Sequence, residues 1–93
     1  MYLHLGSDTV IKTKDIVGIF DMDNTSVSKH TRNYLSNAQK QKRVINVSFE
    51  LPKSYIVCFD GEKETVYISQ IAPSTLIKRL NYMKSNFNYR DLL

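Results

Sequence analysis

The chain has 93 residues, enough for one domain and too few for a second hydrophobic core. Thirteen Lys and Arg residues against nine Asp and Glu residues leave a net charge of +4, which permits a polyanionic partner without proving one. Apolar runs stay near five residues, far below the roughly 20 that a membrane-spanning helix needs. No early hydrophobic stretch resembles a signal peptide. We therefore expect a cytoplasmic protein without a membrane span.

The first part of the chain predicts short strands. Tyr2–Leu5 ends at the turn residues Gly6–Asp8, and Thr9–Lys12 can return from that turn as a second strand. Asp15–Phe20 is apolar on both faces, as is the later run Tyr55–Phe59. A strand of that kind is covered on both sides. One or two helices cover only one sheet face, so we expect a second copy of the protein to cover the other.

A helix is predicted from Ser28 to Lys42, after a loop at 24–28 that is rich in capping residues. Successive residues of a helix lie about 100° apart. On that spacing one side of the helix is apolar and faces the core. Its members are Val27, Thr31, Tyr34, Leu35 and Ala38.

The opposite side of this helix is basic. Its members are Lys29, Arg32, Ser36, Lys40 and Arg43, joined in the chain by Lys42. A solvated helix face is the commonest meaning of such a stripe. Here, however, no acidic residue lies between Asp23 and Glu50. Unpaired like charges repel one another, so this segment is more easily understood if it meets phosphate groups.

The second half predicts a strand, a tight turn, a strand and a helix, after a further short strand at Val44–Phe49. Ser54–Phe59 and Thr65–Ser69 flank Asp60-Gly61, a strong hairpin signal. Pro73 suits a first helical turn, and an apolar stripe runs on to Met83. The fold class is therefore α+β: a small, mainly antiparallel sheet with a central and a C-terminal helix. Residues 1–83 form the single domain and residues 84–93 a tail, which either docks on a neighbour or stays disordered.

One motif looks catalytic. Asp21-Met-Asp23-Asn-Thr25 after an apolar run resembles the nucleophile motif of haloacid dehalogenase-like phosphatases. Those enzymes have a doubly wound parallel sheet, which needs crossover helices and more residues than this chain has. They also need a second acidic pair, which is missing here. His4 and His30 have no second ligand at metal-binding spacing. We expect no catalytic residue, no metal site, no cofactor and no small-molecule substrate, and Cys58 is expected to be a buried small hydrophobe.

Four segments in order carry a family resemblance: Tyr2–Gly6, Ile16–Thr25, Leu51–Val57 and Val66–Arg79. Over about residues 1–80 they resemble the RemA/RemB family of small bacterial extracellular matrix regulatory proteins, and the RemB type most. The resemblance implies a cytosolic DNA-binding regulator that activates biofilm-matrix genes. It also implies a ring-like homo-oligomer that presents basic surfaces to double-stranded DNA.

In RemA-type proteins, basic residues near the second strand and just before the hairpin matter for DNA binding. At those places this chain has Lys12 or Lys14, and Lys53. The single Lys53 stands where the RemA type has adjacent arginines, and a lysine contacts phosphate without the bidentate geometry of arginine. With the helix, the candidate DNA-binding residues are Lys12, Lys14, Lys29, Arg32, Lys40, Lys42, Arg43 and Lys53.

The leading hypothesis is an oligomeric DNA-binding transcriptional regulator that grips mainly phosphate. An alternative is a scaffold or interaction protein whose basic side meets an acidic protein or a membrane surface. A third is a single-stranded nucleic-acid binder that uses Tyr34, Tyr55 or Tyr67 as stacking platforms.

Overall fold

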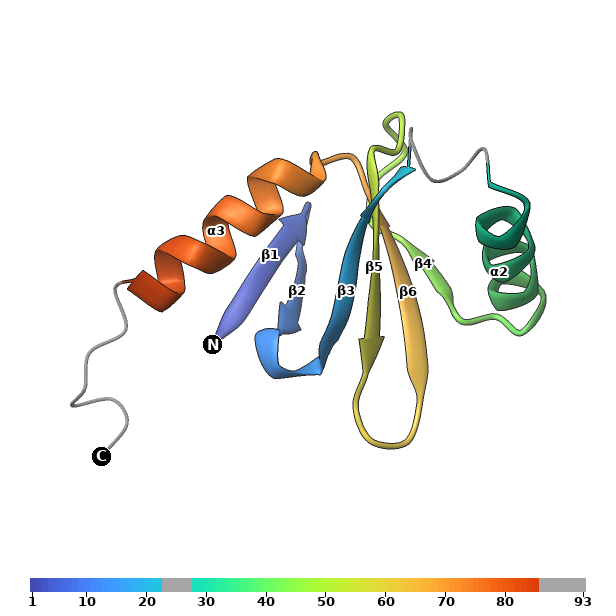
Figure 1. The fold of residues 1–93 in the computed structure, drawn as a ribbon, viewed down its shortest axis with the longest axis horizontal. Coiled ribbons are helices and arrows are strands. Elements are labelled where there is room, and N and C mark those ends of the chain that lie inside the picture. Colours follow the sequence, from blue (N-terminus) through green and yellow to red (C-terminus); the bar gives the residue numbers. More distant parts are fainter. Residues whose placement is uncertain (23–27, 86–93) are drawn as a thin grey trace.

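The computed structural model describes residues 1–22 and 28–85. These residues form a four-stranded sheet and a two-stranded sheet, against which two α-helices pack (Figure 1). The predicted strands at the start of the chain are present, followed by a short 3₁₀ turn that the sequence did not predict. The elements are β1 Tyr2–Gly6, β2 Thr9–Lys12, η1 Thr13–Asp15, β3 Ile16–Asp21, α2 Lys29–Lys40, β4 Val44–Asn46, β5 Ser54–Phe59, β6 Glu64–Ser69 and α3 Pro73–Ser85.

The larger sheet has four strands in the order β3-β5-β6-β4, and β1 pairs with β2 in a separate two-stranded sheet. All pairs are antiparallel except β4 with β6, where Val44 lies opposite Val66. The prediction of a mainly antiparallel sheet with a central and a C-terminal helix is therefore confirmed. The strand predicted at Val44–Phe49 is shorter than expected and ends at Asn46.

The β5–β6 hairpin is the most strongly predicted element and is confirmed. Ser54 pairs with Ser69 at one end and Phe59 with Glu64 at the other. The loop between the strands is held by Asp60, whose Oδ1 accepts the N–H groups of Glu62 at 2.9 Å and Lys63 at 2.8 Å. These two hydrogen bonds lower the pKa of the Asp60 carboxyl, and the bond from the Lys63 N–H is the stronger cause.

Helix α3 begins at Pro73, as predicted. Proline fits a first helical position because its missing N–H would have no partner inside the helix. The N–H groups of Thr75 and Leu76 both bond to the carbonyl of Ala72, which starts the helix. The helix continues to Ser85, and residues 86–93 of the predicted tail lie outside the described residues.

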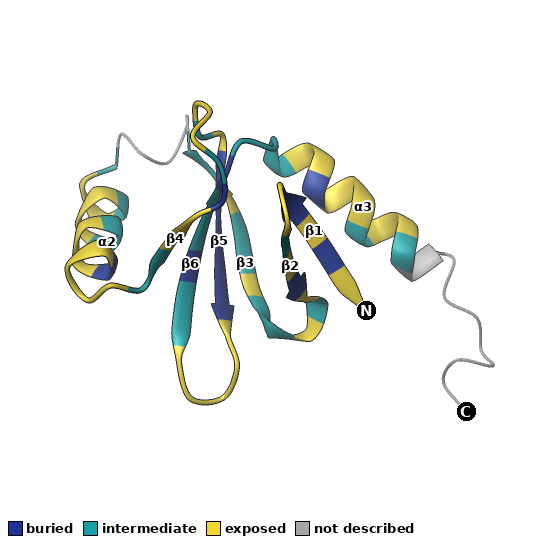
Figure 2. Cartoon of the chain, turned by 180° about the vertical axis from the view of Figure 1, so that it is seen from behind, coloured by how far each residue is buried: buried dark blue, intermediate teal, exposed yellow. Residues whose placement is uncertain are grey.

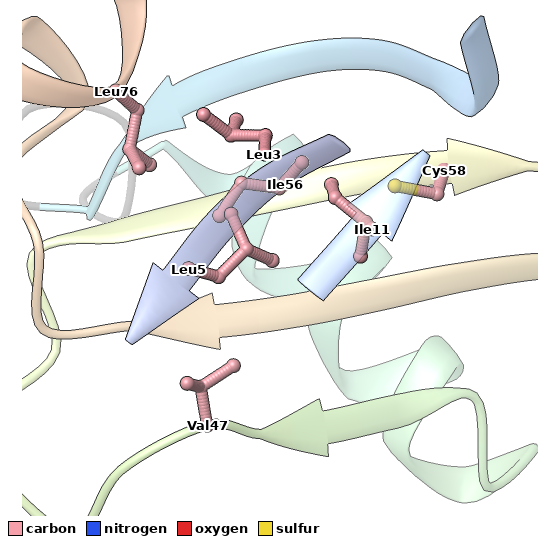
Figure 3. Close-up of a cluster of buried hydrophobic side chains, with 7 residues drawn as sticks. All are labelled: Leu3, Leu5, Ile11, Val47, Ile56, Cys58 and Leu76. Carbon is pink, nitrogen blue, oxygen red and sulfur yellow. The ribbon is translucent and has the colours of Figure 1, made fainter. Parts of the chain in front are cut away.

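Strand β5 lies between two cores and is buried along most of its length (Figure 2). On one side, Ile56 and Cys58 pack against the β1–β2 sheet and α3. On the other side, Tyr55 and Val57 pack against α2. The first core, shown in Figure 3, comprises Leu3, Leu5, Ile11, Val47, Ile56, Cys58 and Leu76.

The need for a second copy to cover β5 is not borne out. Its alternation was predicted correctly, but β1, β2 and α3 cover one face and α2 covers the other, all from one chain. For the edge strand β3 the expected second copy stays a prediction. There Val17 is 67% exposed and Phe20 is 38% exposed.

Candidate nucleic-acid interface

Helix α2 has a buried side and a basic side. Ala38 is fully buried, and Tyr34 and Leu35 pack with it against the sheet, as predicted; Val27, assigned to the same side, lies outside the described residues. Lys29, Arg32 and Lys40 are exposed and are termed the basic face. Their side chains make no ion pair with another described residue, and α2 contains no acidic residue. The basic face is therefore solvated, and no described residue compensates its three charges through an ion pair.

The backbone conformation at the end of α2 sets the directions of Lys42 and Arg43. The N–H of Lys42 bonds to the carbonyl of Gln39 at 3.0 Å, and that of Arg43 to the carbonyl of Ala38 at 2.9 Å. This pair of bonds is a Schellman motif, which needs a left-handed residue where glycine is usual. Lys42 takes that conformation with φ of 58°. The chain therefore turns sharply, and Lys42 remains exposed while Arg43 points back toward the sheet.

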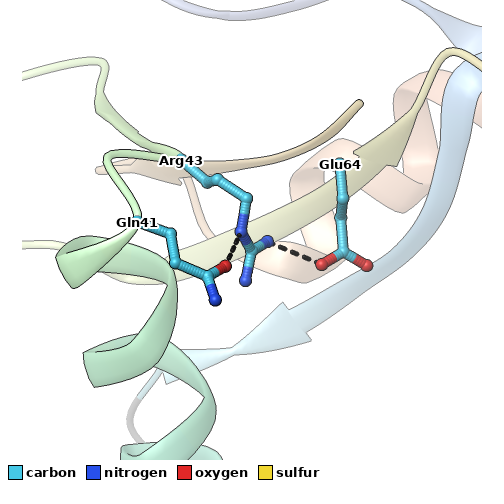
Figure 4. Close-up of polar contacts among 3 residues, drawn as sticks. All are labelled: Gln41, Arg43 and Glu64. Carbon is cyan, nitrogen blue, oxygen red and sulfur yellow. Dashed lines mark hydrogen bonds and ion pairs between the residues drawn. The ribbon is translucent and has the colours of Figure 1, made fainter. Parts of the chain in front are cut away.

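The predicted place of Arg43 on the exposed arc is wrong. The helix ends at Lys40, so helical spacing no longer applies three residues later. Arg43 Nη1 donates to Glu64 Oε2 at 2.6 Å and its Nε to Gln41 Oε1 at 2.6 Å (Figure 4). Its guanidinium carbon also lies 5.9 Å from the centre of the Tyr34 ring, on the buried side of α2. Burial in this corner raises the pKa of Tyr34.

Lys12 and Lys14 lie close together at the end of the β1–β2 sheet. Lys12 is the last residue of β2 and Lys14 belongs to η1, and both are exposed. With Met1 and Tyr2 they line a shallow depression of about 240 Å³. The two lysines therefore form one small cationic site.

Lys53 lies at the other end of the sheet. It is exposed and directly precedes Ser54, which pairs with Asp21 at the end of β3. Lys14 lies near the opposite end of β3, because η1 leads directly into Ile16, the first residue of that strand. Ile16 pairs with Cys58 near the far end of β5. On one chain, the candidate residues thus occupy three places: the Lys12–Lys14 site, Lys53, and α2 with Lys42.

Two comparisons relate this arrangement to known proteins. The family model RemA-like, described as extracellular matrix regulatory protein A-like, matches residues 2–80. Extracellular matrix regulatory protein B of Bacillus subtilis (strain 168) is 41% identical over 83 residues, which cover 89% of this chain and 94% of that relative. The chain belongs to the RemA-like family. The resemblance inferred from the four sequence segments is thereby confirmed.

The phosphatase-like motif of this RemA-like chain is only partly described. Asp21 ends β3 and is half-buried, while Asp23 and Thr25 lie outside the described residues. In the described part of the chain, no group of His, Cys, Asp and Glu residues could hold a metal ion. No described helix is long and apolar enough to cross a membrane. Cys58 is buried, as predicted, and desolvation raises the pKa of its thiol to about 11.

The sequence did not predict an apolar groove, which has a volume of about 350 Å³ and lies between β3 and α2. Phe20 on its wall stacks on Tyr55, with 4.9 Å between ring centroids and 17° between planes. Gly18 makes this possible, because a Cβ there would lie 2.6 Å from the Phe20 ring. Tyr55 is 6% exposed and cannot present its ring to a base, which corrects its assignment as a stacking platform. The groove residues are Val17, Phe20, His30, Thr31, Tyr34, Tyr55, Val57 and Glu64.

Proposed function

We propose that this RemA-like chain is an oligomeric DNA-binding regulator of extracellular matrix genes that binds mainly the phosphate backbone. The observation that supports it is the basic face of α2. Lys29, Arg32 and Lys40 are exposed there, unpaired with any other described residue and without an acidic neighbour on the helix. Lys29 and Arg32 lie one helical turn apart and repel one another in the free protein. Contact with phosphate oxygens relieves that repulsion, and the basic side chains that neutralise the phosphates release counterions from the DNA.

The three separate basic places on one chain favour an assembly over a monomer. Each place carries few charges, and lysine contacts to phosphate are individually weak at physiological salt. Repeating them around a rigid homo-oligomer turns several weak contacts into one strong one through avidity. Sequence preference would then come mainly from the bending and shape of the DNA.

The test is duplex DNA binding measured by fluorescence anisotropy over a salt series, on protein whose mass is fixed by light scattering. We expect the affinity to fall steeply with salt for the multimer. In the variant Arg32→Glu/Lys40→Glu the slope of log affinity against log salt should fall by about one for each lost phosphate contact. The matched control is Lys63→Glu/Lys78→Glu, which makes the same change in net charge at two exposed lysines away from the basic face.

Two results contradict the proposal. Unchanged binding by the double variant would remove the basic face from the interface. Absence of binding even at low salt would mean that this face meets another partner.

The second candidate is a scaffold that binds an acidic protein or an anionic membrane. The fully exposed Phe49 supports a protein contact, because aromatic residues are enriched at protein interfaces. Duplex DNA and anionic vesicles tested at equal ionic strength separate DNA from lipid binding. Competition between single strand and duplex tests single-strand binding, for which Tyr34 and Tyr67 remain partly exposed.

A further inference from the structure

A protruding apolar loop follows β4. Phe49 is 108% exposed, so no described residue covers it, and Leu51 is 80% exposed. Ser48 Oγ accepts the N–H of Glu50 at 3.0 Å, which braces the backbone on either side of Phe49. Residues 48–51 are termed the apolar loop. An aromatic ring held out in water on a braced loop has the properties of an interface anchor.

The groove between β3 and α2 offers a surface on which such an anchor can pack. It is concave, with a volume of about 350 Å³, and it is lined largely by apolar and aromatic side chains. Val17 on its rim is 67% exposed, because a bulge between Ile16 and Gly18 sets it outside the regular pairing with β5. The β3 edge of the sheet therefore exposes Val17, which an apolar side chain of another molecule can contact.

We propose that the apolar loop of one copy places Phe49 in the β3–α2 groove of the next copy. This proposal rests on the homo-oligomer proposed above. The loop and the groove are different surfaces, so the contact is head-to-tail and each copy carries one of each. A head-to-tail contact generates a ring when the rotation between copies closes.

For an incoming Glu50, the groove offers one favourable feature, the N-terminus of α2, and one unfavourable feature, the carboxylate of Glu64. Glu50 is exposed beside Phe49 on the apolar loop. The groove includes His30 in the first turn of α2, and this turn has no acidic residue. A helix N-terminus attracts negative charge. Glu64, the carboxylate that lines the groove, is already paired with Arg43 and so repels an incoming Glu50 less.

The test uses two variants, each defective in one surface. Phe49→Ser/Leu51→Ser removes the apolar anchor and keeps the groove, while Val17→Glu places a charge on the groove rim and keeps the loop. All three positions are exposed, so both variants should fold, which circular dichroism and thermal melting check. The control is Ile77→Glu, which charges an exposed apolar residue on α3.

We expect the wild type and Ile77→Glu to form the full assembly in light scattering without DNA, and each defective variant to be monomeric. Mixing the two defective variants should give a one-to-one heterodimer that grows no further, because one intact loop and one intact groove remain. Variants that still assemble alone would overturn the proposal. A mixture that stays monomeric would also overturn it, since that result indicates a contact between identical surfaces.

A monomeric wild type would refute the homo-oligomer itself and this contact with it. DNA binding is measured separately by anisotropy. An assembly that follows the mixing rule but binds no DNA would refute the proposed function alone.

Discussion

The guanidinium of Arg43 lies 2.6 Å from a carboxylate oxygen of Glu64, and this pair ties the segment after α2 to the first residue of β6. The Arg43 side chain is only 19% exposed. The backbone reinforces the link, because the Arg43 carbonyl accepts the N–H of Val66 at 2.8 Å. Arg43 therefore acts first as a structural residue, unlike the exposed lysines beside it.

Arg43→Gln and Glu64→Gln should each lower the free energy of unfolding, and the two losses should not add. The pair is partly exposed, so we expect a coupling energy of about 1 kcal/mol in a double-mutant cycle measured by urea denaturation. Lys40→Gln, a change at an exposed position, should leave stability unchanged. Fully additive losses would show that the ion pair contributes nothing.

Gly18→Val should destabilise the protein through Phe20. Valine favours strands over glycine by up to about 1 kcal/mol. That gain is outweighed, because a Cβ at Gly18 would lie 2.6 Å from the Phe20 ring and push it off Tyr55. Overpacking and loss of the stack together cost about 1–3 kcal/mol. Thermal melting measures this loss.

The background Phe20→Ala provides the control for that substitution. Without the ring there is no clash, and Gly18→Val should then be neutral or stabilising. Equal destabilisation in both backgrounds would mean that Gly18 is needed for a reason other than the ring of Phe20.

Lys42→Gly should stabilise the protein by about 0.5–1 kcal/mol. Lys42 holds φ at 58°, which is strained for a residue with a Cβ and relaxed for glycine. The greater freedom of glycine in the unfolded chain offsets part of this gain. Lys42→Ala removes the same charge and keeps the strain, so it should gain no stability. A lower melting temperature for Lys42→Gly than for Lys42→Ala would contradict this account.

Stability should fall at alkaline pH through Cys58. Burial raises the pKa of the thiol from about 9.0 to about 11, so between these values the unfolded chain has released a proton that the folded chain retains. The contribution of the protonated Cys58 thiol to the free energy of unfolding is therefore complete below about pH 9, and it is lost as the pH rises to about 11. Two pKa units correspond to roughly 2–3 kcal/mol.

Urea denaturation at a series of pH values measures this loss. Cys58→Ala should reduce the dependence on pH over the same range. In the native wild type at pH 8, a thiol reagent should react slowly and then rapidly once urea unfolds the protein. A steep loss that is identical in Cys58→Ala would assign it to other groups, such as Tyr34 and Tyr67, whose pKa values burial also raises.

The elements predicted best from the sequence are those specified locally. The β5–β6 hairpin follows from alternation around Asp60-Gly61, and α3 from Pro73 and a helical apolar stripe. The position of Arg43 was missed because the usual glycine signal for a helix end is absent, and Lys42 takes the left-handed conformation in its place.

The remaining features depend on contacts between distant segments. No local pattern says that β4 pairs in parallel with β6, or that β1 and β2 form their own sheet over one face of β5. The groove is set by the same long-range packing, since it joins β3 and β5 to α2. Gly18 two residues before Phe20 is the one local hint of a ring lying over a strand.

The parallel pairing of β4 with β6 also has a consequence for the order of assembly. Val44 cannot pair until Val66 is in place, and Val66 comes later in the chain than the whole of β5. Distant pairs form late because closing a long loop loses more entropy than closing a hairpin. Val66→Ala should therefore slow folding, while Val44→Ala should mainly speed unfolding. On the ribosome, β3 emerges before its partner β5, and β4 emerges before its partner β6, so the four-stranded sheet can be completed only after the whole hairpin has emerged.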